Sequence, residues 1–201
     1  KAGVNFTVLE DEPDSGYAYD FLIGAANETK TVMAEAAKKL DYKKIVAYDP
    51  ADAKVFLREY KEWNIGLKSE VVTFTSFISE LIKKGSLKVK NNGEEYTFQD
   101  SSLLSRDLEE IIPAREILSA CGKVKEMLLY GKDTMLAGNS IMKMYMPGVM
   151  KLVADKRWAD AVHVGVKTLV TASPAEYEAL KGSKVKGIEL KTIEEVVSEC
   201  L

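Results

Sequence analysis

Two stretches with the same pattern decide the fold: IVAYDPAD at residues 45–52 and LVTASPAE at residues 169–176. Each begins with a short apolar run that is typical of a buried strand. Each then passes through an acidic or hydroxyl residue, a proline and an alanine to a second acidic residue, which is how many helices begin. Repetition of a pattern within one chain indicates duplicated architecture. The sequence therefore predicts the same strand-to-helix corner in both halves.

Around these corners, short apolar runs alternate with segments of helical periodicity, which predicts βα units and a mostly parallel sheet. The predicted strands are residues 4–9, 44–48, 71–74, 96–99, 124–129, 168–172 and 186–190. The predicted helices are residues 28–40, 51–63, 76–84, 113–120, 141–164, 175–180 and 193–200. Pro147-Gly148 is expected to break the fifth helix. Asn91-Asn92-Gly93 predicts a hairpin between residues 87–90 and 96–99. We expect an α/β protein of two pseudo-symmetric βαβα units, residues 1–92 and 93–201.

The composition is that of an ordinary globular protein, with 201 residues, 46% of them hydrophobic. The 28 basic and 31 acidic residues are interspersed along the sequence. Because they form no basic block, we do not expect nucleic acid as a partner. No apolar run approaches the roughly 20 residues of a membrane span. Two cysteines, Cys121 and Cys200, are too few for a disulfide framework, so we expect a cytoplasmic protein. The single histidine, His163, cannot form a histidine-based metal site without other histidines.

The corner residues have a purely structural interpretation. Asp49 and Ser173 are preferred N-cap residues, and each is followed by a proline at the first helical position. Asp52 and Glu176 follow at the third helical position, so that residues 173–176 form an expected capping box. The functional interpretation stays open beside it, because ligands bind at the carboxyl ends of parallel strands. Residues 14–16, 100–102 and 136–140 also follow predicted strands and are candidates for the same pockets.

Several stretches resemble one family in their order. Residues 98–106 (FQDSSLLSR) and 113–118 (PAREIL) are similar to a "His-Asp-Pro-Cys-His-Leu-Gly-Arg … Pro-Arg-x-x-Leu" motif, and residues 136–138 and 171–176 to "Cys-Cys-Gly" and "Thr-Ala-Cys-Pro-x-Cys". These motifs belong to the cysteine-rich CCG domain of heterodisulfide reductases and of related iron–sulfur subunits of glycolate, lactate and glycerol-3-phosphate oxidising systems. Residues 14–16 and 49–52 resemble a second, N-terminally shortened copy, and we expect the chain to be part of a longer protein.

In that family the motif cysteines are implied to hold iron–sulfur clusters. In this sequence other residues stand at those positions: Asp14, Ser15, Asp49, Asp52, Ser102, Leu136, Ala137, Ser173 and Glu176. Gly16, Gly138 and Arg106 match the glycines and the arginine of the motifs. Because clusters need thiolates, we expect no cofactor and no metal at these positions, and we expect no catalytic residues.

The resemblance implies a cluster-free homologue of an iron–sulfur electron-transfer subunit. Such a chain would serve as a docking or structural module in a redox complex, with a flavoprotein or ferredoxin-like partner. Two alternatives stay open. The chain could belong to an oxidoreductase whose clusters lie in a part before Lys1, or its altered pockets could bind a small polar ligand.

Overall fold

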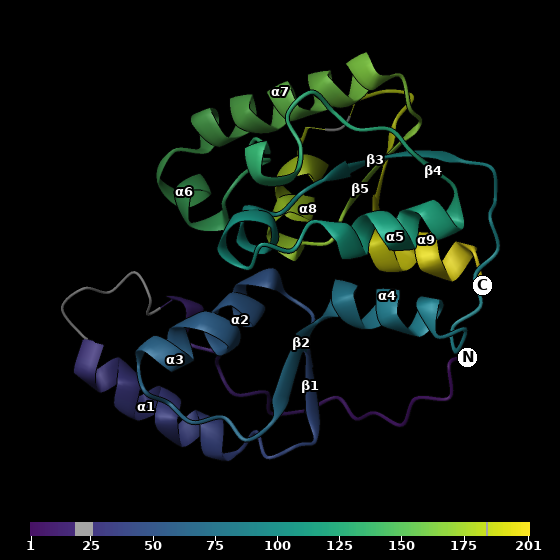
Figure 1. The fold of residues 1–201 in the computed structure, drawn as a ribbon. Coiled ribbons are helices and arrows are strands. Elements are labelled where there is room, and N and C mark those ends of the chain that lie inside the picture. The colour runs from purple at the N-terminus through teal and green to yellow at the C-terminus, as the bar shows by residue number, and fades with distance from the viewer. Residues whose placement is uncertain (19–25, 184) are drawn as a thin grey trace. The chain divides into compact units, whose positions relative to one another are not determined.

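The structure, a computed structural model, describes residues 1–18, 26–183 and 185–201. It divides into two compact units, Lys1–Phe77 and Ile78–Leu201. Each unit contains a parallel sheet accompanied by helices (Figure 1). The predicted α/β class with parallel sheets is therefore confirmed.

The first unit is built on two parallel strands, β1 (Lys44–Ala47) and β2 (Glu70–Thr73). The β-branched side chains of both strands suit a half-buried sheet. The helices of this unit are α1 (Ala26–Lys38), α2 (Pro50–Lys54), the π-helical segment η3 (Val55–Glu59) and α3 (Tyr60–Glu62). Its core consists of Met33, Ala37, Val55, Tyr60 and Ile65. The next helix, α4 (Phe74–Lys83), begins in the first unit and continues into the second.

The second unit is built on four parallel strands in the order β4-β3-β5-β6. These strands are β3 (Glu95–Gln99), β4 (Lys123–Val124), β5 (Thr168–Thr171) and β6 (Glu189–Thr192). The helices are α5 (Ile112–Cys121), α6 (Ser140–Tyr145), α7 (Pro147–Val164), α8 (Pro174–Lys181) and α9 (Ile193–Glu199), with the short segments η4 (Leu103–Asp107) and η5 (Gly131–Asp133). The carboxyl ends of β3 and β5 are adjacent, because Gln99 pairs with Thr171.

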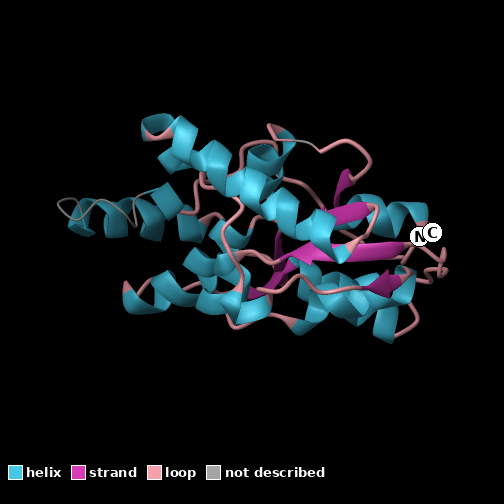
Figure 2. Cartoon of the chain, turned by 90° about the horizontal axis from the view of Figure 1, so that it is seen from above, coloured by secondary structure: helices cyan, strands magenta, loops and turns pink. Residues whose placement is uncertain are grey.

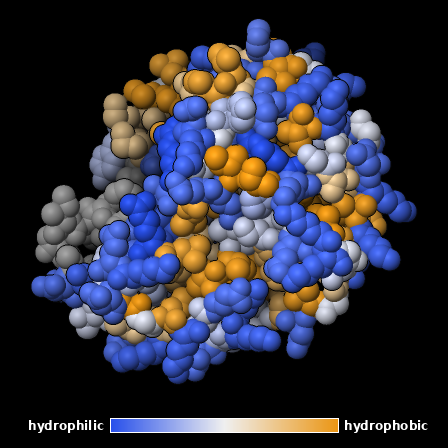
Figure 3. All heavy atoms as spheres, viewed as in Figure 1, coloured by the Kyte–Doolittle hydropathy of each residue, from blue (hydrophilic) through white to orange (hydrophobic). Residues whose placement is uncertain are grey.

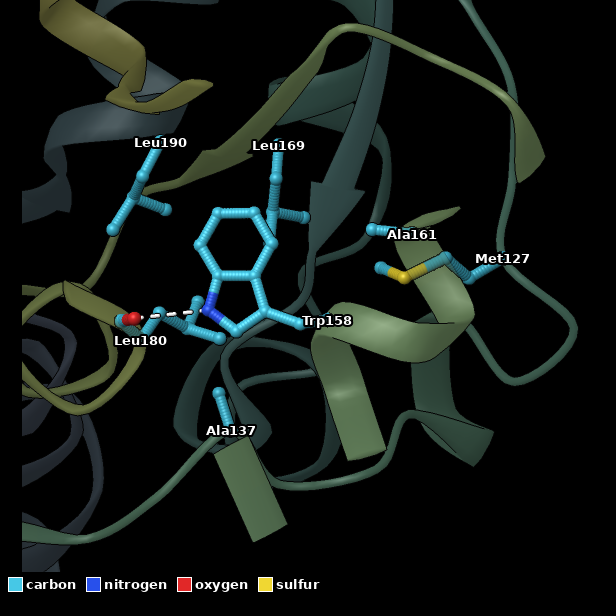
Figure 4. Packing of buried hydrophobic residues seen from close by; sticks show 7 residues of the cluster. All are labelled: Met127, Ala137, Trp158, Ala161, Leu169, Leu180 and Leu190. Atoms are coloured by element: carbon cyan, nitrogen blue, oxygen red, sulfur yellow. Dashed lines mark hydrogen bonds between the residues drawn. The ribbon is translucent and has the colours of Figure 1, made fainter. Parts of the chain in front are cut away.

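Helices cover both faces of this sheet. In Figure 1, α7 lies on one face, and α5 and α9 lie side by side on the other; Figure 2 shows α7 from above, across the strands. The core on the α7 side surrounds Trp158, which is fully buried. Its indole N–H donates a hydrogen bond of 2.9 Å to the carbonyl of Leu180, and Leu169 of β5 packs beside it (Figure 4). This core fixes α7 and α8 against the sheet next to the second corner.

Most predicted elements are present, with boundaries that shift by a few residues. The predicted break at Pro147-Gly148 is confirmed, since α6 ends at Tyr145 and α7 begins at Pro147. The strand predicted at residues 124–129 is much shorter and forms β4, Lys123–Val124. No helix within the described residues is long and apolar enough to span a bilayer.

Two of the predicted elements are wrong. Residues 4–9 form no strand, and the side chains of Phe6 and Val8 are exposed. At Asn91-Asn92-Gly93 the Gly93 N–H donates to Asn91 Oδ1, and Gly93 has a positive φ. This segment does not form a hairpin, because β3 already has parallel neighbours on both sides, β4 and β5, so that residues 87–90 have no edge to pair with.

Candidate functional site

The first corner joins β1 to α2 as the sequence predicts. Asp49 has extended backbone angles, and its carboxylate accepts a hydrogen bond of 2.9 Å from the Ala51 N–H. Pro50 occupies the first helical position, where its missing N–H leaves no backbone bond unmade. The predicted N-cap role of Asp49 is therefore confirmed.

The loop at residues 14–16 lies beside this corner. Asp14 Oδ1 accepts a hydrogen bond of 2.7 Å from the Gly16 N–H, and the buried Ser15 hydroxyl is hydrogen-bonded to the carboxylate of Asp52. Gly16 has a positive φ of 96°, and a Cβ there would overlap the Met33 side chain, so glycine is required. The structure thus brings four of the candidate positions together, those of Asp14, Ser15, Asp49 and Asp52.

Burial and mutual repulsion mark the electrostatics of this group. Burial raises the pKa of both Asp49 and Asp52. Repulsion from Asp52 raises the pKa of Asp49 further, and repulsion from Asp14 raises that of Asp52. Burial and the same acidic neighbours raise the pKa of Tyr60 to about 12. The Tyr60 hydroxyl is buried and has no hydrogen-bond partner among the described residues. The corner is therefore a half-buried group of acidic side chains, Asp14, Asp49 and Asp52.

The second corner differs from its prediction. Ser173 begins α8 with extended backbone angles, but its side chain makes no capping bond in the described structure. Its own N–H donates to Thr171 Oγ1 at 3.2 Å. Glu176 turns toward the sheet, where it is 5% exposed and hydrogen-bonded to Gln99 and Thr171. The expected capping box at residues 173–176 is therefore wrong. The Glu176 carboxyl group, which would have bonded to the backbone of Ser173, is turned toward the sheet instead.

Glu176 is an unusual buried acid. Burial raises its pKa well above the ordinary value, and the neighbouring carboxylate of Asp100 adds to this, while hydrogen bonding to Gln99 and the charge of Arg157 oppose it. Its Oε2 atom has no hydrogen-bond partner among the described residues. A protonated carboxyl group fits this surrounding better than a carboxylate.

The loop at residues 136–138 packs directly on the second corner. Ala137 is fully buried and belongs to the core around Trp158 (Figure 4). Gly138 has a positive φ of 154°, and a Cβ there would overlap the Cβ of Ala179 in α8. Leu136 is largely exposed. At Ala137 and Gly138 the space beside the corner is filled by tightly packed apolar atoms, and neither side chain offers an atom that could bind a metal.

The two remaining candidates lie in η4 or directly before it. Ser102 precedes this segment without a capping bond, and its side chain is half-buried. Arg106 donates from Nε to the carbonyl of Lys132 at 2.8 Å and from Nη2 to the carbonyl of Thr134. Arg106 therefore ties η4 to the segment that leads into residues 136–138, which is a structural role.

A buried ion-pair network joins one candidate residue, Asp100, to two residues that the sequence analysis did not single out, Arg115 and Glu126. Arg115 donates to both carboxylate oxygens of Asp100, at 2.8 and 2.9 Å, and to both of Glu126, at 2.7 and 3.0 Å. Its guanidinium also lies over the rings of Phe98 and Tyr130. Although burial lowers the pKa of Arg115, the bonds to both carboxylates raise it overall. Asp100 and Arg115 fall within stretches that resemble the family motifs, residues 98–106 and 113–118, so the sequence offered a signal for these two residues.

A second buried arginine connects α7 to the end of β3. Arg157 is completely buried and donates from Nε to Gln99 Oε1 at 2.5 Å and from Nη2 to the Leu129 carbonyl at 3.0 Å. Gln99 in turn donates to the carbonyls of Asp100 and Met135. The carboxyl end of β3 is thus filled by a satisfied polar network.

A cavity of about 600 Å³ lies in the second unit. Its lining includes Tyr96, Thr168 and Glu189, at the beginnings of β3, β5 and β6. Because these strands are parallel, the cavity lies at the opposite edge of the sheet from Ser173 and Glu176.

Fold and site together define an α/β protein with two parallel sheets and matching strand-to-helix corners. No family model matches the chain. A Bacillus subtilis (strain 168) protein described as "probable iron-sulfur-binding oxidoreductase FadF" is 36% identical to it over 126 residues. The similarity covers 59% of this chain and 17% of that relative, so the chain spans less than a fifth of the relative's length. The chain is thus related to an iron–sulfur oxidoreductase.

This relationship corrects one expectation from the sequence. We expected no cofactor, but the relative is described as binding iron–sulfur, which points to an iron–sulfur cofactor. The residues present can be tested against such a group, because clusters are held by cysteine thiolates. The chain has two cysteines, Cys121 and Cys200, and both are buried at the ends of α5 and α9. Burial and the neighbouring Cys200 raise the pKa of Cys121 to about 12, so that it stays a thiol.

The acidic residues do not supply the missing ligands. The described residues hold no group of three or more histidine, cysteine, aspartate or glutamate side chains placed to bind a metal ion. The donor set of these residues therefore does not fit an iron–sulfur cluster by itself. Thiolates from elsewhere would have to complete it.

Proposed function

We propose that this chain is a scaffold and docking module of an iron–sulfur electron-transfer oxidoreductase. In this proposal it has the architecture of the CCG domain of heterodisulfide-reductase-type subunits, with other residues at the ligand positions. The cofactor of the system is an iron–sulfur cluster whose thiolates come from protein outside residues 1–201. The partners are the cluster-bearing segment and a redox protein of flavoprotein or ferredoxin type.

The observation that carries this proposal is the first corner. Two segments that are far apart in the sequence, residues 14–16 and 49–52, meet there, and Ser15 bonds to Asp52 across them. In the family that the sequence resembles, the cysteines at these positions are implied to hold iron–sulfur clusters. The similarity to a relative described as an iron–sulfur-binding oxidoreductase supports an iron–sulfur electron-transfer system.

Restoring thiolates to the first corner tests the proposal. The variant carries Asp14→Cys, Ser15→Cys, Asp49→Cys and Asp52→Cys in the full chain. After anaerobic incubation with iron and sulfide, we expect it to bind iron and acid-labile sulfide, because a scaffold of this family would place the four sulfur atoms around one cluster.

A matched control separates corner geometry from added cysteine alone. It carries the same number of cysteines at exposed positions of the same unit: Lys39→Cys, Lys61→Cys, Glu62→Cys and Lys68→Cys. We expect this control to bind far less iron than the corner variant. Equal iron in both proteins would overturn the proposed family scaffold.

The alternative of a small polar ligand at the corners has less support. At the second corner, Ala137 and Gly138 pack against the core and α8, and Glu176 bonds to the sheet. At the first corner, the Asp49 carboxylate accepts from the Ala51 N–H of its own helix, and the Asp52 carboxylate bonds to Ser15. The side chains that a ligand would need are largely engaged within the protein.

A further inference from the structure

The only two cysteines of the chain meet in the second unit. Cys121 is the last residue of α5 and Cys200 directly follows α9, and 79 positions separate them in the sequence. Their thiols are hydrogen-bonded to each other, and Cys200 Sγ lies 3.9 Å from the carbonyl oxygen of Cys121. Buried cysteines often serve only as small apolar side chains. Two cysteines in contact are in addition placed to react with each other.

Main-chain hydrogen bonds fix the relative position of the two thiols. Helices α5 and α9 pack side by side on one face of the sheet (Figure 1). The Lys90 N–H donates to the Cys200 carbonyl at 2.8 Å. The Asn92 N–H donates to the Cys121 carbonyl at the same distance, so that one short segment joins the ends of both helices. The contact between the thiols is therefore built into the backbone of this unit.

The cavity of about 600 Å³ lies close to this pair. Its lining includes Asn92, which is bonded to Cys121, and Glu199, which precedes Cys200. It also includes Tyr96, whose hydroxyl accepts from Asn92 Nδ2 at 2.7 Å. Burial raises the pKa of Tyr96, and the two cysteines raise it further, which places the ring beside them.

The thiols themselves are hidden from solvent, since Cys121 is 0% exposed and Cys200 3%. Figure 3 shows hydrophilic atoms interspersed with hydrophobic ones over the part of the second unit that includes α5 and α9. The pair thus lies beneath a mixed surface, with the cavity bringing solvent near it.

These surroundings favour a disulfide over a thiolate. Burial and the contact with Cys200 raise the pKa of Cys121 to about 12. A protein disulfide is easily reduced when the protein stabilises the thiolate that reduction produces. Because burial here opposes the thiolate, we expect a disulfide between the two cysteines to be hard to reduce once it has formed.

We propose that Cys121 and Cys200 form a reversible disulfide, a two-electron redox site that uses no residue of either corner. The oxidant is a low-molecular-weight disulfide such as glutathione disulfide. The thiolate of one cysteine attacks it, forms a mixed disulfide with one glutathione and releases the other. The second cysteine then attacks the protein sulfur of the mixed disulfide, closes the new bond and releases the second glutathione. The two cysteines lose two electrons and two protons, which the two glutathione molecules gain.

A thiol titration of the unmodified chain tests this assignment. The chain is equilibrated in a mixture of glutathione and glutathione disulfide, both in the folded state and by refolding from urea, so that burial does not prevent equilibrium. Alkylation in denaturant counts the free thiols, and the intact mass distinguishes a disulfide from bound glutathione. We expect a monomer that has lost both free thiols and two hydrogen atoms, that retains no glutathione, and that dithiothreitol returns to two thiols.

The unfolding temperature reports whether the bond fits the native packing. The disulfide would close a long loop, since the two cysteines are 79 positions apart. We therefore expect the oxidised chain to unfold about 5–15 °C above the reduced chain. An oxidised chain that unfolds at the same or a lower temperature would overturn the assignment.

Cys121→Ala and Cys200→Ala are the matched controls. Neither variant should form an internal disulfide, and the unfolding temperature of neither should rise in the oxidising buffer. If a variant does not fold, the titration of the unmodified chain still decides. Two free thiols after both routes of equilibration, or only mixed disulfides or cross-linked dimers, would sink the proposal. The corner residues are unchanged in these proteins, so the iron content of the corner variant tests the proposed function separately.

Discussion

Glu176 shows how one residue can depart from a local rule because of its surroundings. Its sequence position favours a capping role, but in the structure its carboxyl group is buried against Gln99 and Thr171. Below the ordinary pKa of a glutamate, the folded and unfolded states are both protonated. As the pH rises, the unfolded state loses its proton first, so the free energy of unfolding falls until the buried group also ionises.

Glu176→Gln removes this pH dependence. We expect the variant to gain stability relative to the parent as the pH rises above the ordinary pKa of glutamate, by about 1.4 kcal/mol for each pH unit over which the buried carboxyl alone stays protonated. Urea unfolding at several pH values measures the difference. The control is Glu178→Gln in the same helix, an exposed residue that pairs with Lys181 and should show no such trend. A difference between Glu176→Gln and the parent that does not change with pH would contradict this account.

Arg115 is the residue on which the buried network depends. Arg115→Met would leave Asp100, which is 2% exposed, without its ion-pair partner. We expect a loss of about 3 kcal/mol in the free energy of unfolding. Urea denaturation checks this, with Lys132→Met as the control, because Lys132 pairs with Glu109 on the surface and should matter by less than about 1 kcal/mol. Equal effects of the two changes would show that the network contributes little.

At the scale of elements, the two corners have the same backbone but different caps. Asp49→Ala should destabilise the protein by about 1 kcal/mol, because it removes the bond to the Ala51 N–H. Thr192→Ala should do the same at α9, where a complete capping box with Glu195 is present. Ser173→Ala should cost much less, since the Ser173 side chain caps nothing in the described structure. Thermal unfolding of the three variants measures these losses of stability. A loss for Ser173→Ala as large as those for Asp49→Ala and Thr192→Ala would contradict the difference between the caps.

The contact between residues 136–138 and α8 gives a second prediction at this scale. Gly138→Ala should destabilise the protein by about 1–3 kcal/mol, because the new Cβ overlaps Ala179. Adding Ala179→Gly should restore part of the loss. Gly148→Ala is the control, since nothing lies within 4 Å of its Cβ position in α7, and it should stabilise by about 0.5–1 kcal/mol. Equal stability of Gly138→Ala and the parent in urea would show that the loop does not pack as described.

The sequence was sufficient for those elements whose local pattern agrees with their surroundings. The strands at β1, β2, β3 and β5 and the helix break at Pro147 follow from apolar runs and proline alone. The strand expected at residues 4–9 fails because its alternating side chains do not pack on a core, and Phe6 and Val8 are exposed. The expected hairpin at Asn91 fails because both edges of β3 are already paired. Packing and pairing are tertiary properties that a local pattern does not contain.

For the whole molecule, the sequence motifs indicated which segments lie close together better than they described the contacts between them. They placed residues 14–16 beside residues 49–52, and the structure brings these together. They did not indicate that Ala137 would fill the core or that Glu176 would be buried, because both depend on the packing of α7 and α8. The predicted repeat boundary between residues 92 and 93 stays a prediction.

The central claim is that the first corner preserves the geometry of a cluster-binding site. The most direct measurement is the iron and sulfide content, with the visible thiolate-to-iron absorption, of the chain carrying cysteine at positions 14, 15, 49 and 52. The account predicts a coloured protein that binds about one cluster per chain after anaerobic reconstitution, and a nearly colourless control with its cysteines at exposed positions. A colourless corner variant that remains folded would contradict the account.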